Sequence, residues 1–308
     1  MWTIASKFFQ KNLFFIYLFI YLIKSFLLPN IKILSFQLFY RLKSLSISRI
    51  SKYKKSETIF IMGGGETINE ITPQQWQTIK TNDSLGINRW LMHKHVPTYM
   101  LIEGYRKSDA KEYSAINDWY DLWRSSDSRT INTLFIIKDL DSLKIRFSEL
   151  MNFKDRLSPM YKLVVPGTSI KSVSKSFEIL SKYQIFNNIK YPVGSKGSIT
   201  HAVSFALLAG YKNIVLCGID LGGNYFWENG NTNDLFWKQK DLITQKDTQL
   251  LDKKHHKTNK RSHDEEIVVE DLLVLIEKHI KRSSDQKIFV SSKNSGLSKH
   301  FKIYFNEE

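Results

Sequence analysis

Residues 197–220 read GSITHAVSFALLAGYKNIVLCGID and form the most informative stretch of the chain. The pattern predicts a helix that opens at Gly197 and Ser198 and stops at Gly210, followed by a short buried strand over residues 213–217. A Gly-Ser pair at a helix start leaves backbone N–H groups and the positive end of the helix dipole available to a phosphate. The alternative interpretation is that Ser198 serves only as the N-cap of this helix.

A second glycine-rich stretch lies earlier in the chain. The apolar residues 58–62 predict a strand, and Gly63, Gly64 and Gly65 follow it before a helical pattern begins. Glycines permit positive φ angles and a close approach of the backbone to a ligand. No Gly-Lys-Ser/Thr follows, as a Walker loop requires, and Ile68 occupies the third glycine position of a dinucleotide fingerprint. The loop therefore predicts either a nucleotide contact or a plain tight turn.

The rest of the chain alternates between strand patterns and helical patterns. Strands are predicted at residues 58–62, 84–87, 98–102, 133–137, 161–165, 213–217 and 287–290, and helices at residues 73–80, 143–152, 170–182, 198–209 and 264–282. This alternation predicts a three-layer α/β domain with a mostly parallel sheet. The hydrophobic content of 42% over 308 residues suffices for one such domain and an appendage.

The order of the motifs is informative in its own right. The chain carries the glycine loop at residues 63–65, then LGINRW at residues 85–90, the Gly-Ser helix from residue 197, and Gly-Ile-Asp at residues 218–220. This order resembles the bacterial sialyltransferases of glycosyltransferase family 42. It also resembles the wider superfamily with a DUF115-type domain, which includes the archaeal 6-hydroxymethylpterin diphosphokinase. The resemblance spans roughly residues 57–305 and implies a Rossmann-like, GT-A-like variant fold with a lid.

The resemblance implies a site for a CMP-sugar donor. The residues that would bind the donor nucleotide are Gly63, Gly64, Gly65, Thr67, Asn88, Gly197, Ser198 and Asp220. Ser198 would hold the donor phosphate, whereas Asp220 would either orient the ribose or cap a turn. Three positions depart from the family. Gly64 replaces a donor-contacting asparagine, Ser195 replaces an arginine, and Gly222 replaces one of two tyrosines that bind the leaving phosphate.

Two residues are candidates for catalysis. Tyr225 matches the other phosphate-binding tyrosine, and His263 is the best match to the family's catalytic histidine. Sugar transfer needs a base that takes the proton of the acceptor hydroxyl, and imidazole suits that role near neutral pH. The alternative for His263 is an ordinary cap or surface residue at the start of a helix.

A metal site is not expected. His255, His256 and His263 fit no standard zinc spacing. Asp139 and Asp141 mimic the Asp-x-Asp of metal-dependent glycosyltransferases, but we interpret them as a surface turn, and the resembled family needs no metal for its chemistry.

Residues 222–262 form a long polar connection that contains several aromatic side chains. Long connections inside compact domains are usually functional lids or disordered. The aromatics favour a lid, which the resemblance implies would close over the donor, with a disordered surface loop as the alternative. The single cysteine, Cys217, lies in a predicted buried strand, so neither a disulfide within the chain nor a catalytic thiol is expected.

The first 56 residues differ from the rest in charge. They hold ten Lys or Arg and no Asp or Glu, within a chain whose formal net charge is +15. Basic residues among Phe, Leu and Ile favour an anionic membrane surface over nucleic acid. We therefore expect residues 1–56 to be a membrane-associating helical segment and residues 57–308 to be the catalytic domain.

The mode of membrane attachment is left open by the sequence. Residues 13–23 are uninterrupted and apolar, which is short of the about 20 residues that span a bilayer. No small-residue cleavage site follows, as a signal peptide would require. After Pro29, one helical stripe collects Ile31, Leu34, Leu38, Leu42 and Leu45. This stripe predicts an interfacial helix, or else a structural helix packed on the catalytic domain.

These observations lead to one expected function and two rivals. The expected function is a glycosyltransferase that moves an acidic sugar, sialic acid by the resemblance, from a CMP-sugar to a glycan or glycolipid acceptor, without a metal. Since nucleotide-sugar donors are cytosolic in bacteria, it would act at the cytoplasmic face of the inner membrane, and a homo-oligomer is left open. The rivals are an ATP-dependent enzyme like the pterin diphosphokinase and a non-catalytic scaffold for glycan assembly.

Overall fold

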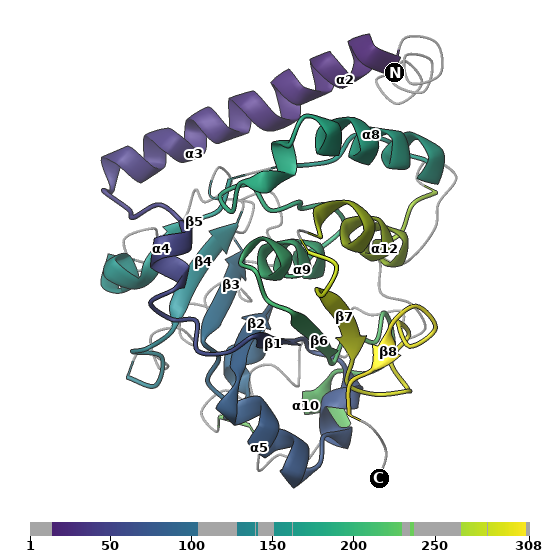
Figure 1. Ribbon diagram of the computed structural model, residues 1–308. Helices are drawn as coiled ribbons and strands as arrows, with labels where there is room; N and C mark the ends of the chain where they lie inside the picture. Colours follow the sequence, from purple (N-terminus) through teal and green to yellow (C-terminus); the bar gives the residue numbers. More distant parts are fainter. Residues whose placement is uncertain are drawn as a thin grey trace.

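The structure is a computed structural model of the chain. It describes residues 14–103, 128–138, 140, 151–161, 163–229, 235–236, 266–281 and 283–305 (Figure 1). Within these residues, one sheet contains the strands β1 (Thr58–Met62), β2 (Asp83–Ile87), β3 (Tyr99–Glu103), β4 (Leu134–Lys138), β5 (Leu157–Pro159), β6 (Asn213–Cys217), β7 (Lys287–Val290) and β8 (Lys302–Ile303). The strand order is β5-β4-β3-β2-β1-β6-β7-β8, and every pairing is parallel. The predicted α/β class with a parallel sheet is confirmed.

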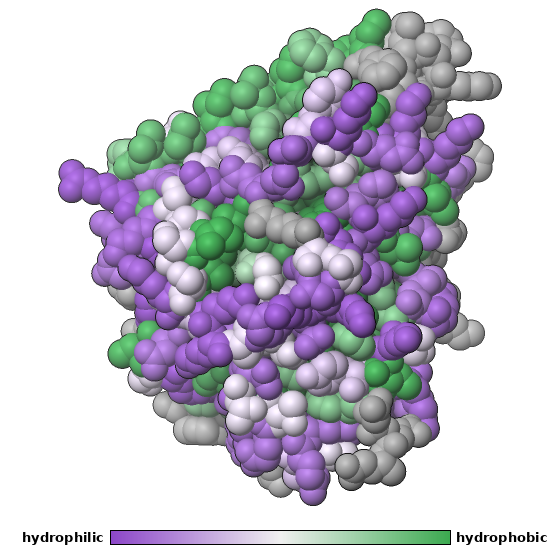
Figure 2. All heavy atoms as spheres, in the orientation of Figure 1, coloured by the Kyte–Doolittle hydropathy of each residue, from purple (hydrophilic) through white to green (hydrophobic). Residues whose placement is uncertain are grey.

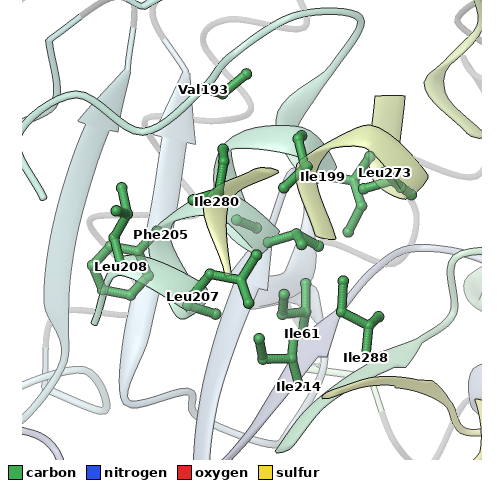
Figure 3. Packing of buried hydrophobic residues seen from close by; sticks show 14 of the residues in the cluster. Ile61, Val193, Ile199, Phe205, Leu207, Leu208, Ile214, Leu273, Ile280 and Ile288 are labelled. Atoms are coloured by element: carbon green, nitrogen blue, oxygen red, sulfur yellow. The ribbon is translucent and has the colours of Figure 1, made fainter. Parts of the chain in front are cut away.

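Helices cover both faces of the sheet, because the buried strands present apolar side chains alternately to each side. In β1, Ile59 and Ile61 join one core cluster, and Phe60 and Met62 join the other. The first cluster lies under α8 (Ile170–Lys182), α9 (Ser198–Leu208) and α12 (Val269–Ile280). The second lies under α5 (Pro73–Thr81) and α10 (Phe226–Asn229). Figure 3 shows Ile61, Ile214 and Ile288 of the sheet close to Ile199, Leu207 and Leu273. The predicted three layers are therefore present.

Local sequence signals explain where two helices begin. Thr72 opens α5 through a reciprocal capping box with Gln75, and Pro73 takes the first turn, where a missing N–H costs nothing. Ser169 opens α8 through the same kind of box with Ser172. Both helix starts coincide with the predicted ones.

Two predicted elements differ from the observed ones, and a third is mostly outside the described residues. The strand expected at residues 161–165 is absent, and its place at the sheet edge is taken by β5. Leu163 forms only an isolated bridge with Val193. The C-terminal helix begins at Val269 rather than residue 264, because residues 266–268 are not helical. The helix predicted at residues 143–152 lies mostly outside the described residues, and the short 3-10 helix η6 (Met151–Arg156) follows it.

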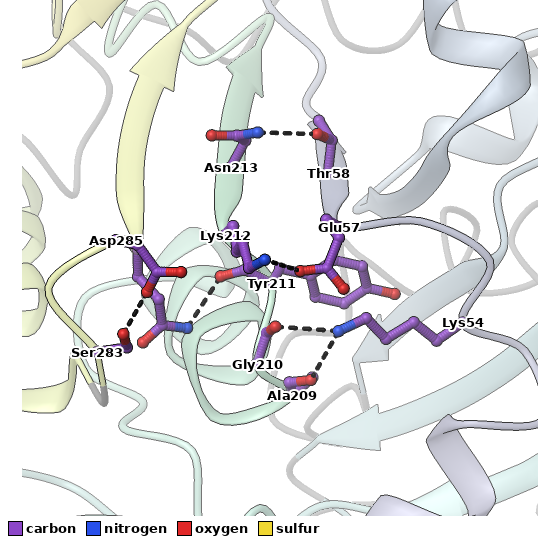
Figure 4. A network of polar contacts seen from close by, with 11 residues as sticks. Lys54, Glu57, Thr58, Ala209, Gly210, Tyr211, Lys212, Asn213, Ser283 and Asp285 are labelled. Atoms are coloured by element: carbon purple, nitrogen blue, oxygen red, sulfur yellow. Dashed lines mark hydrogen bonds and ion pairs between the residues drawn. The ribbon is translucent and has the colours of Figure 1, made fainter.

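The amino ends of β1 and β6 are fastened side by side (Figure 4). Asn213 Nδ2 donates to Thr58 Oγ1 at 3.1 Å, and Lys54 Nζ donates to the Gly210 carbonyl at 2.9 Å. Lys212 and Glu57 form a 3.0 Å ion pair, but both side chains are more than half exposed, so the pair adds little stability. Because the two strands start together and run parallel, the loops that follow their carboxyl ends lie next to each other.

The N-terminal segment forms one continuous helix that packs on the domain. It runs through α2 (Phe14–Leu22), a π-helical turn η1 (Ile23–Leu27) and α3 (Leu28–Phe39). The Leu28 N–H donates to the Ile23 carbonyl, five residues back, and Pro29 next to it supplies no N–H. Residues 18–39 are long and apolar enough to cross a membrane by length and composition alone.

The five apolar residues predicted to share one face of a helix, from Ile31 to Leu45, do not lie on a single helix face. Ile31, Leu34 and Leu38 are exposed, whereas Leu42 and Leu45 are buried in the core. The physical reason is that α3 stops at Phe39 and Arg41 adopts a positive φ of 52°, so the chain turns inward before Leu42. The next helix, α4 (Ile47–Ile50), is capped by Ser46, whose side chain accepts from the Arg49 N–H, and it buries Arg49 and Ile50.

Part of the long connection at residues 222–262 pairs with the backbone beside a buried histidine, His93. The His93 ring stacks between Trp90 and Trp76, at 4.6 Å and 5.0 Å between ring centroids. The backbone of His93 forms an isolated antiparallel β-bridge with Leu235, and the Phe236 N–H donates to the Met92 carbonyl at 2.6 Å. Burial, as the largest cause, lowers the pKa of His93 to about 3.

This burial predicts acid sensitivity. An unfolded histidine titrates near pH 6.5, so the unfolded chain binds protons at His93 before the folded chain does. The contribution of His93 to the free energy of unfolding is complete above about pH 6.5 and is lost as the pH falls toward 3. We expect the melting temperature of the wild type to fall more steeply between pH 7 and pH 4 than that of His93→Gln, which keeps an acceptor but cannot titrate. Equal slopes in a thermal melt series would contradict this role of His93.

Candidate functional site

The candidate site lies where the strand order reverses. From β1 the chain moves outward through β2 to β5, whereas β6 on the other side of β1 leads to β7 and β8. In open parallel sheets, ligands bind in the crevice at the carboxyl ends of the strands that flank such a switch point. Here those ends carry the glycine loop, residues 63–65, and the Gly-Ile-Asp turn, residues 218–220. The two motifs that the sequence singled out are thus neighbours in space.

The glycine loop is held by the neighbouring turn through its own N–H groups. Gly63 N donates to the Cys217 carbonyl at 2.7 Å, and Gly65 N donates to the Gly218 carbonyl at 2.8 Å. These two N–H groups are therefore engaged within the protein and cannot also cradle a phosphate. Gly64 and Gly65 still line the pocket, whereas Gly63 is buried behind it.

Asp220 joins the two loops by capping the turn after the glycines. Its carboxylate accepts from the Thr67 backbone N–H at 2.9 Å and from Thr67 Oγ1 at 2.6 Å. Burial raises the pKa of Asp220, and the hydrogen bonds from Thr67 oppose that rise. The sequence suggested that Asp220 either orients a ribose or caps a turn, and the structure contains the contact that caps the turn. Thr67 serves this contact and faces an adjoining cavity rather than the main pocket.

The start of α9 provides a second wall of the site. Gly197 is the N-cap, with φ of 127°, and no side chain caps the helix there. The loop before it is fixed by Thr200, whose Oγ1 donates toward the Ser195 carbonyl and accepts from the Ser195 N–H. The first N–H groups of an α-helix have no partner within the helix, so they suit an anion. Gly197, Ser198 and Ile199 all line the pocket.

Ser198 is the first residue of the helix and not its N-cap. Its hydroxyl donates to Asn88 Oδ1 at 3.0 Å, which links α9 to the loop after β2. Asn88 is exposed and adopts a left-handed conformation with φ of 54°. The interpretation of Ser198 as a mere N-cap is therefore wrong, because Gly197 is the N-cap and the Ser198 side chain contacts Asn88.

Tyr225 closes the third side of the pocket. Its ring stacks on Trp227 at 4.3 Å between centroids, and its backbone bridges Gly65. The next residue, Phe226, donates its N–H to the Gly64 carbonyl at 2.9 Å. Burial is the main cause that raises the pKa of Tyr225, and the positive charge of Arg89 opposes it. The phenol is thus protonated at neutral pH and can act as a hydrogen-bond donor.

Together these elements surround a pocket with an empty volume of about 780 Å³, its open mouth included. Seven of the ten predicted site residues line it, namely Gly64, Gly65, Asn88, Gly197, Ser198, Asp220 and Tyr225. Sequence reasoning missed Lys196, Asn224 and Val269. The resembled family has an arginine at the position of Ser195, and Lys196 is the next residue. A cation so close to the arginine position could have indicated from the sequence that Lys196 lines the site.

An adjoining cavity shares Asp220 and Gly222 with the main pocket and is more acidic. Its carboxylates are already engaged. Glu70 accepts from Asn294 Nδ2 at 2.9 Å, and Glu270 pairs with Lys299 at 2.7 Å. Among the described residues, no group of three or more His, Cys, Asp or Glu is arranged to hold a metal ion.

The buried thiol of Cys217 takes no part in the pocket lining. Burial raises its pKa to about 12, so the thiol is protonated and unreactive at neutral pH.

Several predicted residues lie outside the described parts of the chain. These are His263, the histidines His255 and His256, and the pair Asp139 and Asp141. Of the predicted lid, residues 222–229 and 235–236 are described, and Phe226, Trp227 and Leu235 are buried in the second core cluster. These parts of the connection are anchored to the domain.

Comparison with known proteins gives no family assignment, because no protein-family model matches the chain and no curated protein matches it.

Proposed function

We propose that the protein is a glycosyltransferase that moves an acidic sugar, sialic acid first among the candidates, from a CMP-sugar to a glycan acceptor. The observation that carries the proposal is the convergence of Asn88, Ser198 and Tyr225 with the start of α9 on one pocket at the switch point of the sheet. These residues come from three separate stretches of sequence, and the resemblance implies a donor contact for each. The acceptor would be an outer glycan of lipooligosaccharide, capsule or a related glycolipid, reached from the cytosolic side.

The pocket suits a donor phosphate at the start of α9. The N–H groups of the first helical turn, which no side chain caps, are donors, and Lys196 adds positive charge. The Ser198 hydroxyl would turn from Asn88 Oδ1 to the phosphate when the donor binds. The Tyr225 hydroxyl would donate to the same phosphate as negative charge develops on it. Such preorganised donors lower the barrier most where charge appears in the transition state.

The reaction would be a single inverting displacement. The acceptor hydroxyl oxygen forms a bond to the anomeric carbon while the bond from that carbon to the CMP phosphate breaks. The bonding electrons leave with CMP, and the hydroxyl proton passes to His263 by the role that the resemblance implies. No metal is required in this scheme, because the charge on the leaving phosphate is met by protein donors.

The rival chemistry is transfer of diphosphate from ATP, as in the pterin relatives. It would need carboxylates that hold Mg²⁺, and the adjoining cavity contains Glu66, Glu70 and Glu270. We favour the transferase because Glu70 and Glu270 are committed to protein partners.

The proposal is tested by incubating the full-length protein with CMP-sialic acid and a mixture of bacterial glycolipid acceptors in EDTA. We expect release of CMP that depends on the acceptor and yields a sialylated product by mass spectrometry. Product formation only with ATP, Mg²⁺ and a hydroxymethylpterin would overturn the transferase and favour the kinase. A protein that turns over neither donor would support the scaffold.

A further inference from the structure

The inner face of the N-terminal helix is built into the domain. Ile33 of α3 is fully buried, and Gln37 beside it is 9% exposed. Gln37 Oε1 accepts from the Tyr161 hydroxyl at 2.6 Å, and its amide nitrogen donates to Ser44 Oγ. Two turns earlier, Phe26 packs on Tyr191 at 5.3 Å between ring centroids. The helix is therefore fixed along its length and does not project away from the domain.

The segment after the helix is fixed as well. Leu42 and Leu45 are buried, and Arg49 donates to the Asp155 carbonyl at 2.7 Å. Lys43 and Asp155 lie together at the surface nearby, at 3.5 Å. If α3 crossed a bilayer in this packed position, these polar groups and the β5 edge would have to enter the hydrocarbon, at a cost of several kcal/mol for each unsatisfied group.

The outer face of the same helix is apolar and exposed. Side chains that recur every three or four residues form this outer stripe, namely Phe19, Ile23, Leu27, Ile31, Leu34 and Leu38, with exposed fractions of 66%, 38%, 49%, 51%, 44% and 68%. Figure 2 shows hydrophobic residues gathered along the edge of the molecule where Figure 1 places α2 and α3. An exposed apolar stripe of this length marks an interaction surface.

The charged side chains on the helix beside the outer stripe are all positive. Lys24 and Lys32 of the helix are exposed, as is Arg41 directly after it, whereas Lys43 is paired with Asp155. Residues 1–56 contain no acidic residue at all. An apolar face flanked by cations is complementary to lipid chains beneath anionic headgroups.

We infer that α2, η1 and α3 form an interfacial anchor that lies flat on an anionic lipid bilayer, with the outer stripe among the acyl chains and the inner face kept on the domain. The anchor attaches the protein to one leaflet and does not span the membrane. This inference concerns the surface alone and holds whichever reaction the pocket performs.

The test is flotation of the full-length protein with vesicles of phosphatidylcholine, with and without phosphatidylglycerol. We expect binding to the anionic vesicles, weaker binding to the neutral ones, and release by high salt or alkaline carbonate, because much of the affinity is electrostatic. Ile23→Glu removes an apolar group from the outer stripe and adds a negative charge. It should lower the partition coefficient by about tenfold or more.

Ile303→Glu is the matched control. Ile303 is 37% exposed, against 38% for Ile23, and it lies on β8 at the opposite edge of the sheet from β5. This variant should float like the wild type, and both variants should show wild-type melting curves. Equal loss of flotation in both variants, or no flotation of the wild type, would overturn the inference.

The same experiment distinguishes two alternatives for the outer stripe, a membrane-spanning helix and a contact with a second copy of the chain. Flotation that survives high salt and carbonate would overturn the flat anchor in favour of a spanning helix. A soluble dimer that Ile23→Glu converts to a monomer, without flotation of the wild type, would assign the stripe to a second copy of the chain.

Discussion

Gly65→Ala is expected to unfold the loop that joins the two halves of the site. An added Cβ would lie 2.6 Å from Asp220 Cγ and 2.8 Å from the Gly218 carbonyl oxygen. Neither group can retreat cheaply, because Asp220 is fixed by its two bonds from Thr67 and Gly218 O accepts from Gly65 N. Overpacking together with loss of these charged hydrogen bonds should cost about 3 kcal/mol or more.

Gly64→Ala is the matched control for this change. Its added Cβ would meet only ring atoms of Trp227 and Tyr225, at 3.3 Å, which shifts of a few tenths of an ångström can relieve. We expect it to cost less than about 1.5 kcal/mol. Chemical denaturation of both variants measures the difference. Equal stability of Gly65→Ala and Gly64→Ala would show that the Asp220–Thr67 contact does not constrain the loop.

The second large effect concerns the proposed base. His263→Ala should lower the rate of sugar transfer by about 10² to 10⁴, the usual share of general base catalysis. CMP binding should stay near the wild-type value, because the donor contacts described above come from other residues. The comparison requires a transfer assay at saturating donor and a parallel binding titration.

His255→Ala and His256→Ala are the controls for His263, since they remove the same side chain at nearby positions of the sequence. Both should keep near-wild-type turnover. Near-full activity of His263→Ala would exclude His263 as the base and transfer the search to these two neighbours.

Much of the fold could be predicted because buried parallel strands leave continuous apolar runs in the sequence. Residues 58–62, 213–217 and 287–290 are strands with the predicted bounds. The strand β5 was missed because it has three residues and ends in Pro159, and an edge strand tolerates a proline that a central strand would not. The apolar run at residues 161–165 looks more like a strand than β5 does, but its burial comes from packing beside Tyr191 and Val193.

The sequence predicted which residues belong to the site, but it did not predict the hydrogen bonds between them. Short motifs located Asn88, Ser198 and the glycine loop, because a helix start and a strand end are local features. That Ser198 bonds Asn88, 110 positions away, or that Asp220 caps Thr67 depends on the order of the strands in the sheet. For the same reason the sequence left open whether the glycine loop contacts a nucleotide or forms a plain turn, whereas in the structure the N–H groups of Gly63 and Gly65 are paired with the carbonyls of Cys217 and Gly218.

The most direct test of the donor site is a calorimetric titration of the full-length protein with CMP in EDTA, with cytidine, ATP–Mg²⁺ and the variant Ser198→Ala as comparisons. The account predicts that CMP binds without metal and that cytidine binds more weakly, because the phosphate contacts at the start of α9 are lost. It also predicts that Ser198→Ala weakens CMP binding by about tenfold, the loss of one hydrogen bond to a charged group. Binding of ATP–Mg²⁺ without any response to CMP would contradict the account.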